Sequence, residues 1–256
     1  MKISVITPSY NQGNFISETI ESVLNQNWDN LEYIIMDGGS TDNTLEIIKK
    51  YDKDNPNKII WKSEKDRGQS HAINKGFELA TGDIVCWLNS DDYFPKDTLK
   101  KVAAKFEDNP NSKWLTGDYI IIDANGNEIQ NFVKKYKNLL KLLPKKLTLS
   151  IANYVNQPST FWRKDIIDEI GLINEDLNYT MDYEYWIRII QKYDPLIVKD
   201  ALSVFRIHGE SKGGDQFEKQ FKEEYQVAKN NNVGILPLLL HSIHNKLIIA
   251  AYKFLK

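Results

Sequence analysis

The sequence predicts an α/β protein whose mixed sheet is covered by helices on both faces. Short apolar runs rich in β-branched residues alternate with helical patterns through the first 113 residues, and this rhythm is typical of a parallel sheet. After Lys113 the rhythm changes to strand-like runs around Asn125-Gly126, a strong hairpin signal. A length of 256 residues with 41% hydrophobic content fits one large domain or two tightly joined halves.

Four strands and four helices are predicted in the first half. The strands are apolar runs with high β-branched content: Ile3–Thr7, Leu31–Met36, Ile59–Trp61 and Ile84–Leu88. The helices follow from apolar spacing and boundary signals: Phe15–Leu24, Thr44–Tyr51, Ser70–Ala80 and a segment that Pro95 opens and Pro110 closes. Asp42 or Asn43 is the expected cap of the second helix, and Gly82 ends the third.

The second half is predicted to add antiparallel strands to the same sheet. The runs Trp114–Asp123 and Glu128–Val133 flank the hairpin signal. We find no internal repeat, low-complexity tract or flexible linker between the halves. The two halves are therefore expected to share one continuous sheet.

The composition excludes several classes of protein. A formal net charge of −2 predicts no nucleic-acid partner. The single cysteine, Cys86, lies in an apolar run and is predicted to be a core residue in a reducing cytoplasm, not a reactive thiol. No segment reaches about 18 uninterrupted apolar residues, the length of a membrane span. The apolar N-terminus is too short for a signal peptide, so we expect a cytoplasmic protein.

Polar clusters follow three of the predicted strands. Residues 7–11 follow the first strand, residues 37–42 the second and residues 89–92 the fourth. Ligands of open parallel sheets bind at the carboxyl ends of the strands. The three clusters are therefore expected to converge on one edge.

Two of these clusters carry carboxylates suited to a nucleotide or a metal. Asp91 and Asp92 directly follow an apolar strand, where adjacent carboxylates suit Mg²⁺ or Mn²⁺ bound to two phosphates. Alternatively, Asp91 caps the next helix and Asp92 is solvated. Asp37 precedes two glycines and could accept a hydrogen bond from a base or ribose, or it could belong to a turn.

Taken together, the motifs resemble those of the inverting family-2 nucleotide-sugar glycosyltransferases, which have the Rossmann-like GT-A fold. The matching segments occur in the family's order and spacing: Ile3–Asn11, Ser22–Gln26, Asp37–Thr44, Asp66–Ser70, Ala72–Gly76, Ala80–Asp83 and Trp87–Asp92. The resemblance covers roughly residues 3 to 210. It implies transfer of a hexose from a nucleoside-diphosphate sugar, commonly a UDP-sugar, to a glycan or lipid-linked glycan hydroxyl in bacterial cell-surface polysaccharide synthesis.

The resemblance also implies a donor site and a metal, Mn²⁺ or Mg²⁺. The residues expected to contact the nucleotide-sugar are Thr7, Pro8, Ser9, Asn11, Asp37, Asp66, Arg67, Asn89 and Asp91. The metal is assigned first to Asp92, with Asp91 and His208 as further ligands. Many members have Asp where this chain has Asn89, which removes one charged candidate. The alternative for His208 is a surface turn.

The segment Met181–Arg188 resembles the family's acidic motif at the start of a helix, and Asp182 is the expected catalytic base. Such a carboxylate takes the proton of the acceptor hydroxyl as it attacks. In most members an acidic residue stands where this chain has Met181. The alternative for Asp182 is a carboxylate at a helix N-terminus that the helix dipole stabilises. The residues expected near the acceptor are Gln157, Trp162, Glu184 and Trp186, with Glu184 as the fallback base and a core position as the alternative for both tryptophans.

The predicted organisation is a GT-A domain over residues 1–215 and a helical tail over residues 216–256. The donor-binding half covers about residues 1–113, and the acceptor half covers about residues 114–215.

Two basic, apolar segments predict peripheral attachment to an anionic membrane at its cytoplasmic face. The first lacks acidic residues between Ile129 and Lys164, and its leucines alternate with Lys134, Lys135, Lys137, Lys141, Lys145 and Lys146. The second has apolar residues at helical spacing beside lysines: Leu240, Ile243, Leu247, Ala251 and Phe254, with Lys246, Lys253 and Lys256. The alternative is that both stripes pack on the domain core.

Two other functions are considered. A sugar-1-phosphate nucleotidyltransferase needs a Gly-rich phosphate loop after the first strand, where this chain has Pro8–Gly13 without a Gly-x-Gly. A non-catalytic nucleotide-sugar-binding module would keep the donor motifs and would not need Asp182.

Overall fold

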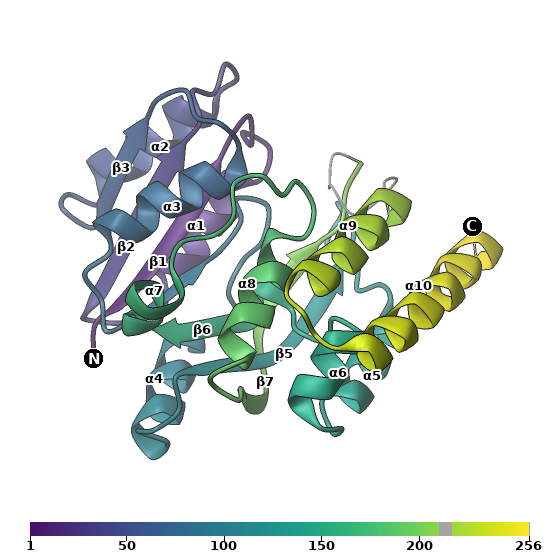
Figure 1. Ribbon diagram of the computed structural model, residues 1–256. Helices are drawn as coiled ribbons and strands as arrows, with labels where there is room; N and C mark the ends of the chain where they lie inside the picture. The colour runs from purple at the N-terminus through teal and green to yellow at the C-terminus, as the bar shows by residue number, and fades with distance from the viewer. Residues whose placement is uncertain (210–216, 256) are drawn as a thin grey trace.

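The computed structural model describes residues 1–209 and 217–255, with side chains described as far as residue 250. One mixed seven-stranded sheet runs through both halves in the order β3-β2-β1-β4-β6-β5-β7 (Figure 1). Its strands are β1 Ile3–Ser9, β2 Leu31–Asp37, β3 Ile59–Ser63, β4 Ile84–Trp87, β5 Trp114–Ile122, β6 Thr160–Arg163 and β7 Leu196–Arg206. Strands β1 to β4 are parallel, whereas β6 is antiparallel to β4 and β5. The predicted mixed sheet is confirmed.

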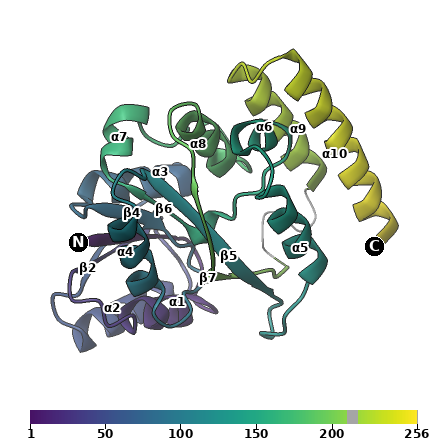
Figure 2. The same cartoon turned by 90° about the horizontal axis from the view of Figure 1, so that it is seen from below.

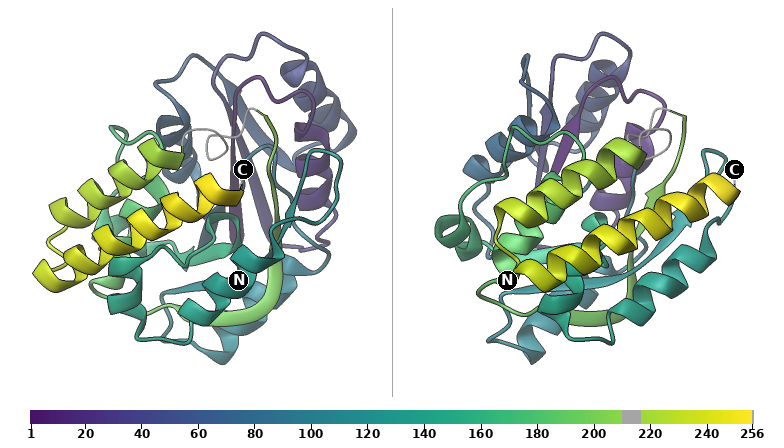
Figure 3. Two further views of the ribbon diagram at one scale, coloured as in Figure 1. Left: turned by 90° about the vertical axis from the view of Figure 1, so that its right-hand side faces the viewer. Right: turned by 45° about the vertical axis from the view of Figure 1, so that its right-hand side comes forward.

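Helices cover both faces of this sheet (Figure 2). The helices α3, α7 and α8 lie on one face, and α1, α2 and α4 lie on the other, while the remaining helices gather beyond one end (Figures 1 and 3). Their bounds are α1 Ile16–Leu24, α2 Thr44–Asp54, α3 Gln69–Leu79, α4 Thr98–Asp108, α5 Asn131–Leu140, α6 Lys145–Ile151, η1 Gln157–Ser159, α7 Asp165–Ile170, α8 Met181–Ile190, α9 Phe217–Asn230 and α10 Ile235–Leu255.

A cluster of tryptophans fills the core where the two halves meet. The ring of Trp186 stacks on Trp87 at 5.5 Å and on Trp114 at 5.7 Å, and Trp162 meets it edge-on. Each fully buried side chain of this size contributes roughly 1.5–3 kcal/mol or more. Trp162 and Trp186 are completely buried, so the expectation that they stack on an acceptor sugar is wrong. Cys86 is also buried and unpaired, as expected of a core residue.

The predicted strand over residues 128–133 does not form. The turn at Asn125-Gly126 exists, with a φ of 87° at Gly126, but a single bridge between Ile122 and Glu128 follows it. Strand β6 covers only Trp114–Thr116 of β5, so the far end of β5 does accept the bridge and a hydrogen bond from the N–H of Ile129 to the carbonyl of Ile121 at 2.8 Å, but the pairing stops there. Residues from Asn131 onward form helix α5 instead.

Strand β1 continues through Pro8, where the sequence predicted its end. The neighbouring β4 pairs with β1 only as far as Ile6 opposite Trp87. The missing N–H of Pro8 points to that side, so no ladder hydrogen bond is lost. Helix α4 begins at Thr98 rather than at Pro95, after Asp97 adopts a left-handed conformation.

Helix α10 packs on the domain through polar residues rather than through its predicted apolar stripe. His241 is fully buried with Nδ1 3.0 Å from the carbonyl oxygen of Ser150, and Asn245 donates to the carbonyl of Phe221 at 3.1 Å. The stripe residues Leu240, Ile243 and Leu247 are exposed, so they do not belong to the core. The side chains of Ala251, Lys253 and Phe254, and all of Lys256, lie outside the described residues, as does the proposed boundary at 215/216. No helix within the described ranges is long and apolar enough to cross a membrane.

Candidate nucleotide-sugar site

The first two polar clusters meet because their strands are adjacent. Strands β1 and β2 end in register, with Ser9 opposite Asp37. Asn11 adopts a left-handed conformation with a φ of 52°, its backbone N–H donates to Ser40 Oγ at 2.8 Å, and its Oδ1 accepts from the backbone N–H of Thr41 at 2.8 Å. The side chain of Asn11 therefore fixes the loop after β2 against the loop after β1.

The Asp37 carboxylate organises this loop from within. Its Oδ2 accepts hydrogen bonds from the backbone N–H groups of Gly39 and Ser40 at 3.0 Å and from Ser63 Oγ at 2.7 Å. The side chain is almost fully buried. These contacts fix the loop in which the sequence predicts contact with the base.

The end of β1 carries two buried hydroxyl groups, those of Thr7 and Ser9, which differ in their hydrogen bonding. Thr7 is fully buried, with Oγ1 3.2 Å from the hydroxyl of Tyr33, and Pro8 is buried beside it. The hydroxyl of Ser9 is buried without a hydrogen-bond partner among the described residues. Since buried polar groups are nearly always paired, this hydroxyl is a candidate partner for a bound ligand.

Asp66 lies directly against the loop after β2. A Cβ atom on Gly38 would lie 2.6 Å from Asp66 Oδ2, so only glycine permits this approach. The other oxygen of Asp66 accepts from the backbone N–H of Gly68 at 2.8 Å. The structure thus joins Asp66 to the Asp37 loop, as a shared donor site requires.

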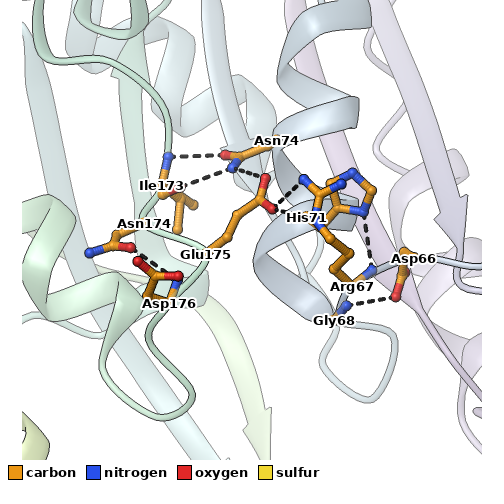
Figure 4. Close-up of polar contacts among 9 residues, drawn as sticks. All are labelled: Asp66, Arg67, Gly68, His71, Asn74, Ile173, Asn174, Glu175 and Asp176. Carbon is orange, nitrogen blue, oxygen red and sulfur yellow. Dashed lines mark hydrogen bonds and ion pairs between the residues drawn. The ribbon is translucent and has the colours of Figure 1, made fainter.

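Arg67 points across the site to the loop that precedes α8 (Figure 4). Its Nε and Nη2 donate to Glu175 Oε2 at 3.2 and 2.6 Å. Asn74 of α3 donates to the other oxygen of Glu175 at 3.0 Å and bonds the backbone of Ile173 through both its amide oxygen and its amide nitrogen. Glu175, the partner of both Arg67 and Asn74, was not among the residues predicted from the sequence, because these pairings depend on the tertiary fold.

Asn89 is the centre of a hydrogen-bond network at the end of β4. Its Oδ1 accepts from Gln69 Nε2 at 2.8 Å, and its Nδ2 donates to Gln157 Oε1 at 3.1 Å and to Asp92 Oδ2 at 3.2 Å. Gln157 also donates to the carbonyl of Trp87 at 2.7 Å. Gln157, expected near the acceptor, therefore adjoins the acidic cluster.

Asp92 is poorly placed to be the first metal ligand. It is fully buried, and its Oδ1 accepts from the backbone N–H of Arg206 at 3.0 Å. Burial, together with the charge of Asp91, raises its pKa well above the usual value. Both oxygens of Asp92 are thus bonded within the fold, whereas Asp91 lies beside His208, and the order of metal ligands predicted from the sequence stays a prediction.

Asp91 and His208 come together because β7 returns beside the acidic cluster. An antiparallel bridge between Tyr93 and Val204 aligns the two segments. His208 Nε2 then lies 3.0 Å from Asp91 Oδ2, and the imidazole packs on Phe15 with ring centroids 4.4 Å apart. A carboxylate and an imidazole suit Mn²⁺, although no group of three such ligands occurs within residues 1–209 and 217–255. Donor phosphates would have to supply the remaining ligands.

Asp182 occupies the first turn of α8. Burial raises the pKa of its carboxyl, and the nearby charge of Lys137 opposes that rise. The fallback base, Glu184, is held by Arg188 in an ion pair with Nε–Oε1 at 2.8 Å, and its side chain is largely buried. This pairing gives Glu184 a structural role, whereas Asp182 remains the candidate base.

Comparisons with known proteins place the chain in a family. It matches Glycosyl transferase family 2 over residues 4–171. The uncharacterized glycosyltransferase MJ1057 of Methanocaldococcus jannaschii is 28% identical over 238 residues, which cover 90% of this chain and 79% of that protein. TuaG of Bacillus subtilis, a glycosyltransferase whose name assigns it provisionally to teichuronic acid biosynthesis, is 35% identical over 137 residues, or 54% of each chain. The chain spans between about a third and about half the length of the first curated relatives it matches.

Solved structures share the fold. The structure of S. aureus TarS 1–349 with UDP-GlcNAc has a TM-score of 0.70 at 22% identity, covering 91% of this chain and 67% of that one. The mannosyltransferase PcManGT from Pyrobaculum calidifontis, in complex with GDP-Man and Mn²⁺, has a TM-score of 0.69 at 16% identity, covering 99% and 80%. The chain is a member of glycosyl transferase family 2, and its mixed sheet is the GT-A fold.

Proposed function

We propose that this protein is a metal-dependent, inverting glycosyltransferase that moves a sugar from a nucleoside-diphosphate sugar, a UDP-sugar, to a hydroxyl of a glycan or lipid-linked glycan. The observation that carries the proposal is the meeting of the loops after β1, β2, β3 and β4 at one sheet edge. The donors named in the TarS and PcManGT complexes, and the teichuronic acid role in the name of TuaG, support a nucleotide-sugar donor and a cell-surface polysaccharide product.

In this proposal the donor lies across the carboxyl ends of β1, β2 and β4. Ser9 and the loop held by Asp37 and Asn11 bind the nucleoside, and Arg67 donates to the diphosphate. Asp91 and His208 hold Mn²⁺ or Mg²⁺, which would neutralise charge on the leaving diphosphate.

The chain's own groups then carry out the transfer. The carboxylate of Asp182 accepts the proton of the acceptor hydroxyl while that oxygen attacks the anomeric carbon. The bond to the diphosphate breaks on the opposite side, so the configuration inverts. Residues 1–113 form the donor half in this proposal, and about residues 114–215 form the acceptor half.

The test is release of free nucleoside diphosphate from a panel of nucleotide-sugars, with wild type and Asp182→Asn compared. We expect the amide variant to lose about 10²–10⁴ in rate while donor affinity stays within a few fold, because the amide keeps the shape but cannot accept a proton. A binding module would bind donors without releasing diphosphate. A nucleotidyltransferase would instead form nucleotide-sugar from a sugar phosphate.

We also propose that α5, α6 and α10 bind the cytoplasmic face of an anionic membrane, which would bring a lipid-linked acceptor to the site. These helices lie along one side of the molecule (Figures 1 and 3). They expose an apolar helical surface made of Phe132, Leu139, Leu142, Leu143, Leu147, Ile235, Leu236, Leu239, Leu240, Ile243 and Leu247. The exposed fraction reaches 78% at Leu142, in the turn between α5 and α6, and 91% at Ile235, and many exposed large apolar side chains are typical of an interaction surface.

Charge supports this orientation, although the predicted Lys137 and Lys141 do not contribute, because their ammonium groups donate to main-chain carbonyls. Lys135, Lys146 and Lys246 are exposed on the same helices. Lys141 is buried and donates to the carbonyl of Gly117 at 2.9 Å, and burial lowers its pKa to about 8. Each exposed lysine near an anionic surface adds about 1 kcal/mol of attraction.

A further inference from the structure

Helix α9 holds the backbone that leads into Asp182. One oxygen of Glu223 accepts hydrogen bonds from the backbone N–H groups of Tyr179 and Thr180 and from Thr180 Oγ1, each at 2.8 Å. The other oxygen accepts from the N–H of Asn178 at 3.1 Å. Four bonds to one carboxylate, each assisted by its charge, fix the start of α8.

Helix α5 adds a cation to the same place. The ammonium of Lys137 donates to the carbonyl of Val155 at 3.2 Å and interacts electrostatically with both Asp182 and Glu224. Glu224 of α9 is buried and accepts a hydrogen bond from the backbone of Asn153. We call Lys137, Asp182 and Glu224 the Lys137 cluster; burial lowers the pKa of Lys137, and Tyr183, Glu223 and Lys141 are further titratable groups that face the cluster.

The cluster places two carboxyl groups around one cation. Burial favours the neutral form of each carboxyl and raises the pKa of Glu224 to about 7. Burial also raises the pKa of Asp182, and Lys137 is the cation that opposes the rise. Without this cation, the buried Glu224 and the half-buried Asp182 would interact with no countercharge, a costly arrangement.

We propose that Glu223 and Lys137 are positioning residues for the base: the four hydrogen bonds of Glu223 to residues 178–180 fix the turn that carries Asp182, and Lys137, held by the carbonyl of Val155, supplies the cation beside it. The inference rests on the proposed role of Asp182. It gives α9 a part in the reaction, and it gives α5 a second role besides the proposed membrane contact.

The experiment measures the pH dependence of kcat/KM together with carboxyl ¹³C NMR titration of the protein without substrate. Lys137→Met should move the acid limb, and the NMR midpoint of Asp182, to higher pH by about one unit or more. Lys137→Arg keeps the charge and should leave both near the wild-type position. The matched control is Lys222→Met, which removes an exposed charge from α9 and should change neither.

The carboxylates of α9 are tested in the same way. Glu224→Gln should not raise the acid limb, because a neutral amide adds no charge that disfavours the ionised base. Glu223→Ala should lower kcat by roughly 10- to 100-fold through misplacement of Asp182 while the donor KM stays within a few fold. An unchanged kcat in Glu223→Ala would remove that residue from the positioning role.

The outcomes separate this inference from the proposed function. If Asp182→Asn keeps full turnover, the base assignment fails whatever Lys137 does. If turnover needs Asp182 but Lys137→Met shifts neither the acid limb nor the NMR midpoint, the role of Lys137 alone is wrong. If Lys137→Met does not fold, the NMR titration of the wild-type protein tests the proposed interactions of the Lys137 cluster. A Glu224 carboxyl with a pKa near the ordinary glutamate value would contradict them.

Discussion

The imidazole Nε2 of His208 lies 3.0 Å from Oδ2 of Asp91, although 117 positions separate the two residues. The return of β7 beside the acidic cluster makes this contact, through the bridge between Tyr93 and Val204. Asp92, one position from Asp91, points inward and is bonded within the fold. Neighbouring carboxylates therefore have different environments.

We predict different effects for these neighbours. Asp91→Asn and His208→Ala should raise the Mn²⁺ concentration needed for half activity by about tenfold or more. Asp92→Ala should instead lower stability by about 1–3 kcal/mol, because it leaves the backbone N–H of Arg206 and one of the two amide hydrogens of Asn89 unpaired. Electron paramagnetic resonance of Mn²⁺ binding in the presence of UDP, with thermal unfolding, measures both. Loss of Mn²⁺ binding in a fully stable Asp92→Ala protein would restore Asp92 as the main ligand.

The Arg67–Glu175 ion pair should compete with the donor diphosphate for the same guanidinium. Glu175→Gln is therefore expected to tighten donor binding, by no more than about fivefold, because exposed pairs contribute about 1 kcal/mol or less. Arg67→Ala should weaken binding. Calorimetric titration with UDP-sugars measures both, and Glu64→Gln, which breaks the exposed pair with Lys75, is the control. Weaker donor binding by Glu175→Gln would mean that the carboxylate orients Arg67 instead.

The apolar helical surface should bind anionic vesicles at low salt and release them in part at high salt. Leu239→Glu with Leu247→Glu should abolish sedimentation with the vesicles. Ile60→Glu, which changes an exposed apolar residue of β3, should leave it intact. These substitutions change only exposed side chains. Truncation after Asn232 would be a less specific test, because it would also remove the buried contacts of His241 and Asn245. If the double variant still sediments with the vesicles, the apolar helical surface is not the membrane-binding site.

Glu224 should make stability fall as the pH rises. Its folded-state pKa is raised from 4.5 to about 7, so the protonated carboxyl favours the folded state and this advantage is lost between those two values. Glu224→Gln should therefore unfold at a higher temperature than wild type at pH 8, with little difference at pH 4. The exposed Glu107→Gln is the control. Equal midpoints at pH 8 would show that Glu224 is not buried in an unfavourable charge state.

The sequence predicted the parallel strands well because β-branched runs between helical patterns are local signals. It failed at residues 128–133, where pairing with β5 stops after residues 128 and 129 and helix α5 begins at Asn131. It treated Lys137 and Lys141 as surface charges, whereas both ammonium groups reach carbonyl oxygens inside the fold. The group formed by Asp91 and His208 was expected from family resemblance, since spacing alone could not bring them together.

The amide of Asn74 has a mechanical consequence. Asn74 belongs to α3, which begins directly after the Arg67 loop, and it bonds the main chain of Ile173 in two directions. Residues 173–175 lead toward Asp182 along the chain. In the proposed donor site, a displacement of α3 on donor binding would therefore be transmitted through these two hydrogen bonds to the segment before Asp182.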